Sequence, residues 1–340
     1  MSEPVALREQ HAPAFAESPG VCRCPPRARA LELPEPGEER WQDMVHVPAG
    51  TFLMGSDRFY REERPARRAS VEAFWIDAHP VTNRQFQSFV AATGYLTVAE
   101  RAPDPGLYPD ADPALLVPGS LVFQAPARRV SLRDPRAWWA YVPGASFRHP
   151  EGPHSTLAGR GEHPVVHVSY EDACAYAAWA GKTLPTETEW EFAARGGLDA
   201  ATFPWGDEFA PDGQLMANIW LGQFPCENLK QSGLERTSPV KAFPANGFGL
   251  YDVVGNVWEW TASAFEPLAA PQSTGSCCGP ATAAPSSTRV VKGGSHLCAP
   301  NYCLRYRPAA RQGQAVDTST GHIGFRCVVR AAGAPQRSRA

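Results

Sequence analysis

The sequence predicts a single α+β domain that is rich in loops and low in regular secondary structure. Its 340 residues include 34 prolines and 29 glycines, which interrupt helices and strands. Ten tryptophans and sixteen phenylalanines indicate a fold held together by aromatic packing, in contrast to a helical bundle. The helix and strand signals are short and the connections between them are long. Connections of that length usually carry a function or need an ion to order them.

The chain divides into one domain between two tails. Residues 1–42 are rich in Pro, Glu and Arg and show little apolar periodicity, which is typical of a flexible tail. Residues 332–340 have a similar composition. We therefore expect one domain at residues 43–331, in which residues 266–288 form an excursion loop and not a domain boundary.

Four short segments have the composition of strands. Met44–Val47 is followed by a Pro-Ala-Gly turn and then by Thr51–Gly55, which predicts a hairpin. Val71–Asp77 contains alternating aromatic residues and is expected to form a strand. Gly324–Arg330 is expected to close the domain as its last strand.

Three helices have readable start and stop signals. Each begins at a serine or threonine, and in the first and third the capping-box partners are Gln85 and Glu189. Each ends at a glycine, which readily adopts the left-handed conformation that terminates helices. The expected helices are Thr82–Ala92, Ser169–Ala180 and the segment from Thr186 up to Gly196.

The composition argues against several kinds of partner. The formal net charge of −3 gives no general reason to expect nucleic-acid or membrane binding. The N-terminus lacks the basic start and apolar run of a secretory signal, and no apolar segment is long enough to span a bilayer. A cytoplasmic location is therefore expected, where reducing conditions disfavour stable disulfides. We also expect a monomer.

Two cysteines near the C-terminus are the strongest candidates for chemistry. Cys298 and Cys303 follow a Gly-Gly turn and precede basic residues, and nearby guanidinium groups favour the thiolate. Their spacing differs from Cys-x-x-Cys, and two sulfurs cannot complete the tetrahedral shell of structural zinc. They can hold Cu(I), for which thiolate is a preferred ligand. A redox pair or a two-thiolate metal site thus competes with a structural disulfide or two inert thiols.

The loop from Asp252 to Trp260 has the composition of a calcium site. Asp252 and Glu259 can supply carboxylate oxygens, and a tight turn at Gly255 exposes main-chain carbonyls between them. Mixed oxygen shells of this kind suit Ca²⁺, although the spacing is not that of an EF-hand. From the residues alone the alternative is favoured, namely a turn capped by Asp252 with Trp258 and Trp260 packed in the core.

A series of motifs occurs in one collinear order between about Met44 and Cys327. They are Pro48–Gly55, Thr93–Thr97, Trp138–Trp139, Arg148–Pro153, His163–Ser169, Trp179–Lys182, Leu184–Glu187, Glu189–Glu191, Phe203–Gly206, Ala217–Trp220, Gly255–Trp260 and Gly324–Cys327. Their order resembles the formylglycine-generating enzymes, also called sulfatase-modifying factors, which have a loop-rich fold of C-type-lectin-like type. Many of these motifs are shared by the wider fold superfamily. The discriminating feature is the pattern Gly-Gly-Ser-x-x-Cys-x-x-x-Tyr-Cys-x-Arg-Tyr-Arg, which Cys298 and Cys303 satisfy.

The resemblance implies a copper-dependent oxidase that uses O₂. Such enzymes convert the cysteine of a Cys-x-Pro-x-Arg segment in an unfolded sulfatase chain into Cα-formylglycine, which matures the sulfatase. Cys298 and Cys303 would bind Cu(I), and the substrate cysteine would add a third thiolate. Matching positions imply that Ser295, Tyr302 and Trp258 line the oxygen and thiolate pocket.

The resemblance also implies two calcium sites, each built from side-chain oxygens and main-chain carbonyls. The ligands of the first would be Asp252, Glu259 and the carbonyls of Gly255 and Val257. Those of the second would be Asn218 and the carbonyls of Ile219 and Leu234. The second site departs from the family at Ser232, where an acidic ligand is common, and a hydroxyl binds Ca²⁺ more weakly than a carboxylate. Glu227 or Glu235 could compensate.

Three arginines and two further cysteines have structural alternatives. Arg305, Arg307 and Arg311 follow the cysteine pair and are expected to form structural ion pairs, the commoner role of clustered arginines. Cys174 lies one helical turn before the position where some relatives carry a cysteine that pairs with the equivalent of Cys327. The two residues could form a disulfide or remain thiols.

Two other functions compete with the oxidase. One is a non-catalytic binding domain on the same scaffold, which uses its surface for a protein or glycan partner. The other is a related iron-dependent sulfoxide synthase, which would need a His-rich iron motif on an accompanying helical domain, and the sequence contains neither. The intact cysteine pair favours the oxidase over both.

Overall fold

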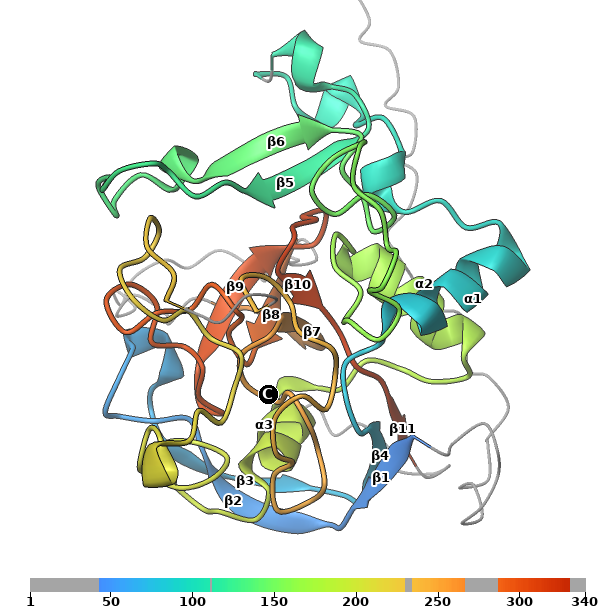
Figure 1. Ribbon diagram of the computed structural model, residues 1–340. Coiled ribbons are helices and arrows are strands. Elements are labelled where there is room, and N and C mark those ends of the chain that lie inside the picture. Colours follow the sequence, from blue (N-terminus) through green and yellow to red (C-terminus); the bar gives the residue numbers. More distant parts are fainter. Residues whose placement is uncertain (1–42, 111, 230–233, 267–286, 331–340) are drawn as a thin grey trace, which may run out of the picture.

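A computed structural model describes residues 43–110, 112–229, 234–266 and 287–330 of the chain (Figure 1). In these ranges three α-helices and eleven β-strands are joined by long loops and short 3₁₀ turns, so the predicted loop-rich α+β domain is confirmed. None of the described helices has the length and apolar character needed to cross a bilayer. The predicted tails, Ser232 and the pair Cys277–Cys278 lie outside the described residues.

The strands form two sheets and two separate pairs. One sheet has the order β1-β4-β11, with all neighbours antiparallel, and the other has the order β10-β7-β8-β9, in which only β10 and β7 are parallel. The first sheet consists of β1 (Met44–Val47), β4 (Phe74–Asp77) and β11 (Val328–Arg330). The second consists of β10 (Ile323–Gly324), β7 (Trp258–Ala264), β8 (Thr288–Lys292) and β9 (Arg311–Ala315). The two pairs are β2 (Gly50–Met54) with β3 (Arg67–Val71), and β5 (Gly119–Phe123) with β6 (Trp139–Pro143).

The hairpin expected between the first two strands is wrong. β1 pairs with β4, and β2 pairs with β3, so the two neighbours in sequence belong to different sheets. Both pairs contribute to one core cluster, in which Val47 and Phe74 are buried and Phe52 packs its ring against Phe192 of the third helix. Residues 71–77 also divide between two strands, and the expected closing strand is split by the buried Arg326 and Cys327.

All three predicted helices are confirmed with their caps. They are α1 (Asn83–Thr93), α2 (Tyr170–Trp179) and α3 (Glu187–Arg195), and each has a reciprocal capping box at its N-terminus. Gly94 and Gly196 end α1 and α3 at φ values of 67° and 58°, in the left-handed region. The sequence predicts these caps correctly because a cap depends on hydrogen bonds between residues within one turn of the chain.

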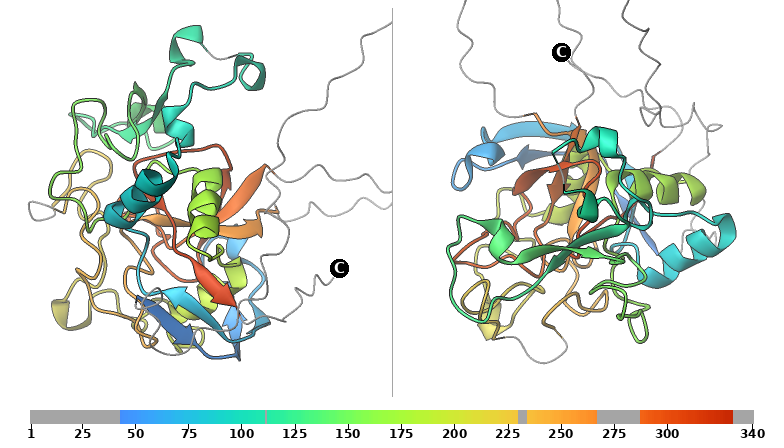
Figure 2. Two further views of the ribbon diagram at one scale, coloured as in Figure 1. Left: turned by 90° about the vertical axis from the view of Figure 1, so that its right-hand side faces the viewer. Right: turned by 90° about the horizontal axis from the view of Figure 1, so that it is seen from above.

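Helix α3 lies between the β2–β3 pair and the second sheet (Figure 1). Its Trp190 is buried, and the indole Nε1 donates to Glu259 on β7 at 2.7 Å. The β5–β6 hairpin lies at the opposite end of the molecule from β2 and β3 (Figures 1 and 2). The second sheet and the long loops that follow its strands occupy the space between these ends.

Several completely buried charged side chains are held in ion pairs. Arg307 is 1% exposed and donates two hydrogen bonds to the carboxylate of Glu63, at 2.9 and 2.5 Å. Arg326 pairs in the same two-bond manner with Glu259, at 2.7 and 2.8 Å. A buried charge costs several kcal/mol unless its partner is present, so these pairs bind distant segments together. The predicted ion-pair roles of Arg305, Arg307 and Arg311 are confirmed.

Replacing Glu63 by Gln should therefore destabilise the fold strongly. The variant leaves the buried Arg307 guanidinium without a carboxylate, and we expect a loss of about 3 kcal/mol in the free energy of unfolding, measured by urea denaturation. The matched control is Glu162→Gln, which breaks the exposed pair with Arg84 and should cost less than about 1 kcal/mol. Equal losses in the two variants would contradict this assignment.

Candidate functional site

A Gly-Gly turn after β8 leads into the segment that contains Cys298 and Cys303, and both cysteines lie in the main core cluster. Gly293 and Gly294 have φ values of 91° and 70°, where other residues are strained. A Cβ on Gly293 would lie 2.9 Å from the carbonyl oxygen of Val253, and one on Gly294 would lie 2.9 Å from the Arg305 backbone. Only glycine therefore lets the chain turn here and pack against the residues that follow the second cysteine.

The turn brings the two cysteine sulfurs face to face. The Cys298 amide bonds the Ser295 carbonyl at 2.9 Å and the Cys303 amide bonds the Ala299 carbonyl at 2.8 Å, so the loop coils tightly between them. The two Sγ atoms are 3.0 Å apart, well beyond the ~2.05 Å of a disulfide. Both residues are buried and both are free thiols. The sequence pair is thus a spatial pair as well.

The two thiols differ in acidity. The hydrogen bond from Cys298 is the largest influence on Cys303 and, with the positive charge of Arg305, lowers the pKa of Cys303 to about 7. Burial raises the pKa of Cys298 well above its ordinary value, and its hydrogen bond to Cys303 acts in the same direction. When the pair loses its first proton, the negative charge therefore resides on Cys303, and Cys298 keeps its proton and donates it to Cys303.

Arg305 is held beside Cys303 by residues that the sequence did not suggest. Its Nη1 lies 4.0 Å from the Cys303 sulfur, and its Nη2 donates to Glu62 at 2.5 Å. The guanidinium also stacks on Tyr60, 3.9 Å from the ring centroid, and the Tyr60 hydroxyl accepts a hydrogen bond from the Leu304 amide at 2.9 Å. Nothing in the sequence indicates that Glu62 contacts Arg305, because the two residues lie 243 positions apart.

Three residues predicted to line the pocket retain hydrogen-bond donors. The Ser295 hydroxyl accepts from the Leu297 amide at 3.2 Å, which leaves its proton to donate, and the Ser295 amide faces the Cys298 sulfur at 3.4 Å. Trp258 is buried in the same core cluster as both cysteines. Within the described residues, the Trp258 indole N–H and the Tyr302 hydroxyl have no hydrogen-bond partner.

Tyr302 marks the outer edge of the cysteine pair. It is 38% exposed, whereas the adjacent Cys303 is 8% exposed. Its ring stacks on Phe224, with centroids 4.5 Å apart, and meets Trp138 edge-on at 5.5 Å. Pro300 and Asn301 beside it are exposed as well, so the segment directly before Cys303 reaches the surface.

Of the two carboxylates predicted for the first calcium site, only Asp252 is left without an ion pair among the described residues. Asp252 is buried and forms no ion pair within the described residues, and burial raises its pKa to about 6, so a cation would stabilise its charged form. Glu259 instead accepts three hydrogen bonds, two from Arg326 and one from Trp190. These occupy three of its roughly four lone-pair sites. Asp252 thus fits a cation, and Glu259 is committed mainly to Arg326.

The loops that carry the two calcium sets pack against each other. Gly255 has a φ of 75°, and a Cβ there would lie 2.6 Å from the Asn218 carbonyl oxygen. The Asn256 amide donates to that carbonyl at 2.8 Å, and the Asn218 amide group donates to the Arg236 carbonyl at 2.9 Å. Ile219 is buried beside Asn218, whereas Leu234 lies in a separate loop at the edge of the described residues.

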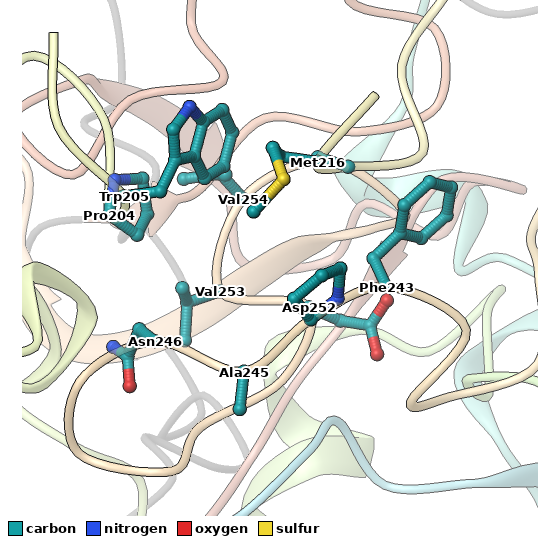
Figure 3. A pocket seen from close by; sticks show the side chains of 11 residues that line it. Pro204, Trp205, Met216, Phe243, Ala245, Asn246, Asp252, Val253 and Val254 are labelled. Carbon is teal, nitrogen blue, oxygen red and sulfur yellow. The ribbon is translucent and has the colours of Figure 1, made fainter. Parts of the chain in front are cut away.

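A small pocket opens next to Asp252, away from the cysteine segment (Figure 3). Trp205, Met216 and Phe243 supply most of its apolar wall, and the Asp252 carboxylate lies beside Phe243. None of the residues that line it belongs to the segment from Gly293 to Arg307.

Cys174 and Cys327 are not joined by a disulfide in this structure. Cys327 is completely buried between β10 and β11, and burial raises its pKa. The backbone amide of Cys327 donates to the Asp77 carboxylate at 2.8 Å. This environment makes Cys327 a protected core thiol.

The chain matches the family model described as the sulfatase-modifying factor enzyme 1-like domain over residues 30–331. It belongs to this family. The formylglycine-generating enzyme of Mycobacterium tuberculosis is 58% identical, over 84% of this chain and 97% of the relative. That of Bos taurus is 46% identical, over 84% of this chain and 74% of the relative. The resemblance inferred from the motifs is confirmed.

Other members and neighbours of the family differ in activity. The inactive C-alpha-formylglycine-generating enzyme 2 of Mus musculus is 40% identical, over 84% of each chain. Among solved structures, PvdO from Pseudomonas aeruginosa is similar, with a TM-score of 0.55, 25% identity, and coverage of 85% of this chain and 95% of PvdO. The predicted fold type is confirmed.

The unequal acidity of the thiols predicts selective alkylation of the metal-free protein. A small thiol reagent should modify Cys303 first, with a rate that rises as pH increases through about 7 and levels off above pH 8, because the thiolate is the nucleophile. Peptide mapping by mass spectrometry identifies the modified cysteine at each pH. A first reaction at Cys298, or a rate that rises only above pH 9, would refute the assignment.

Proposed function

We propose that this protein is a copper-dependent oxidase that converts the cysteine of a Cys-x-Pro-x-Arg segment in an unfolded sulfatase into Cα-formylglycine, with O₂ as the oxidant. The names of its relatives support the reaction and the sulfatase partner. The observation that carries the proposal is the facing pair of Cys298 and Cys303, two unbonded thiols 3.0 Å apart. The cytoplasmic location and the monomeric state stay predictions from the sequence.

The donor set fits a cuprous ion. Cys298 and Cys303 offer two soft sulfur ligands and, in the described part of the chain, no group of three or more His, Cys, Asp or Glu is arranged to hold a metal. When bound, Cu(I) would supply single electrons to O₂, which redox-inert Zn²⁺ cannot do. Cys303 loses its proton first. Only the Cys298 proton must then leave before both sulfurs can act as thiolates.

The surrounding residues prepare this pair for a third thiol. Arg305 places positive charge beside Cys303 and favours anionic sulfur there. The buried indole of Trp258 keeps bulk water from the sulfurs, and Ser295 and Tyr302 have protons to donate to a reduced oxygen species. The substrate cysteine would enter past Tyr302, the exposed neighbour of Cys303. Two hydrogens then leave the substrate cysteine, one from Cβ and one from sulfur, and O₂ accepts the two electrons. The resulting thioaldehyde is hydrolysed by water to the aldehyde, and the sulfur leaves as hydrogen sulfide.

Calcium is proposed as a structural ion at the Asp252 loop. The Asp252 carboxylate supports this role because it is buried and, among the described residues, accepts hydrogen bonds from the Lys241 amide and Asn256 but forms no ion pair. The carbonyls of Gly255 and Val257 lie in the same turn. The second set, Asn218, Ile219 and Leu234, is proposed as a weaker site because Ser232 offers only a hydroxyl. Neither site takes part in the chemical step.

Replacing either sulfur should abolish turnover without unfolding the protein. We expect Cys298→Ser and Cys303→Ser to convert no Cys-x-Pro-x-Arg peptide in the presence of Cu(I) and O₂, as followed by mass spectrometry for loss of sulfur and gain of oxygen. Cys174→Ala, which removes a thiol on α2, is the matched control and should remain active. Near-normal activity of either serine variant would contradict the two-sulfur site. Failure of the unaltered protein at every copper concentration would favour a non-catalytic binding domain.

Calcium removal should lower thermal stability through Asp252. We expect a chelator to lower the melting temperature of the unaltered protein, because the buried Asp252 carboxylate loses its counter-ion. In Asp252→Asn the same chelator should have little effect, since the neutral amide binds Ca²⁺ weakly. Scanning calorimetry with and without added Ca²⁺ measures both shifts. No change in the unaltered protein would count against the site.

A further inference from the structure

The loop at the end of the β5–β6 hairpin presents unpaired positive charge. Four arginines lie on residues 124–138, and all four are exposed. Arg136 pairs with Asp134 on the same loop, at 2.9 Å. The side chains of the other three, Arg128, Arg129 and Arg133, form no ion pair or hydrogen bond with any described residue. The loop therefore carries a net positive charge that nothing within the described residues neutralises.

Aromatic packing anchors this loop beside the cysteine segment. Trp138 at its base is buried and contacts Tyr302 and Phe224, with ring centroids 5.5 and 5.4 Å apart. Val130 and Leu132 of the loop pack against the cluster that contains Leu297 and Ala299, the neighbours of Cys298. Figure 1 shows the tip of the hairpin on the side of the loops that carry these partners. The arginines are thus held at a defined place relative to the thiols.

The base of this loop adjoins the exposed segment that leads into Cys303. Pro300, Asn301 and Tyr302 are exposed, and Trp138 borders Tyr302 directly. Arg305, the cation beside Cys303, is already bound to Glu62. Glu227 on the neighbouring loop is exposed and lies beyond ion-pair distance of the arginines. Approaching carboxylates would therefore meet guanidinium groups with free donors, which bind carboxylates in a two-bond geometry.

We propose that Arg128, Arg129 and Arg133 form a docking surface for acidic residues that flank the target motif in the substrate polypeptide. This inference rests on the proposed function, because it names a feature of the substrate beyond the Cys-x-Pro-x-Arg segment. An unfolded chain is steered by such charges and is held close to the thiols while its cysteine enters. The attraction acts between exposed groups, so it weakens as salt shortens the screening length to ~8 Å at physiological ionic strength.

The test compares peptides with one Cys-x-Pro-x-Arg core and different flanks. A pair of Glu, Gln or Lys residues is moved stepwise along each side of the core, and kcat/KM is measured at low salt and at high salt. For at least one placement we expect the Glu peptide to exceed the Gln peptide about three- to tenfold at low salt, with the Lys peptide lowest. The differences should shrink at high salt.

Charge reversal supplies the decisive variant. Arg128→Glu/Arg129→Glu should lose the preference for Glu flanks and favour Lys flanks, while its kcat for the Gln peptide stays close to that of the unaltered protein. The matched control, Arg67→Glu/Arg68→Glu on β3 at the opposite end of the molecule, should keep the original preference (Figure 1). A preference that is absent at every placement, or that survives the reversal at residues 128 and 129, would overturn the proposal.

Binding separates this inference from the proposed reaction. The affinities of fluorescently labelled peptides with serine in place of the target cysteine are measured by anisotropy, which requires no turnover. If no peptide is converted but Glu flanks still strengthen binding and the reversal abolishes the effect, the proposed reaction fails and the docking surface stands. If conversion occurs equally for all flanks, the reaction stands and the docking surface fails.

Discussion

The cysteine segment depends on two ion pairs that join residues more than two hundred positions apart. Glu63 holds the buried guanidinium of Arg307, and Glu62 holds Arg305 beside the Cys303 sulfur. A guanidinium at these depths is tolerated only with its carboxylate present, so the loop before β3 and the loop after the thiols must fold as one unit. The position of the charge that acidifies Cys303 is therefore a consequence of the fold and not of the local sequence.

Around these ion pairs, the cysteine sulfurs are buried away from water, whereas Tyr302 reaches the surface. The sulfurs lie in an apolar cluster with Trp258, where electrostatic effects are strong and bulk water is excluded. Tyr302 bridges that cluster and the surface, and its stacking on Phe224 and contact with Trp138 connect it to the arginine-bearing hairpin. The same aromatic contacts thus support the thiol pair and place positive charge near its entrance.

The Asp252 loop shows how one motif can serve two purposes. Glu259 is used chiefly to neutralise Arg326, whose other donors bind the carbonyls of Asp77, Ala78 and Tyr251. Asp252 has no such partner within the described residues and remains suited to a cation. The family resemblance implied calcium for both carboxylates, since sequence spacing does not reveal that an arginine between β10 and β11 enters the same space.

The amino-acid sequence by itself determined the three capped helices, the loop-rich domain and the family, and it singled out Cys298 and Cys303 as candidates for chemistry. Each of these depends on short-range signals, such as a capping threonine or the spacing of two thiols after Gly-Gly. Only the tertiary structure decided that β1 pairs with β4, that Tyr60 and Glu62 position Arg305, and that the arginine hairpin borders Tyr302. Those contacts join segments remote along the chain, and they form because burying apolar and charged groups together selects one arrangement among many that local preferences allow.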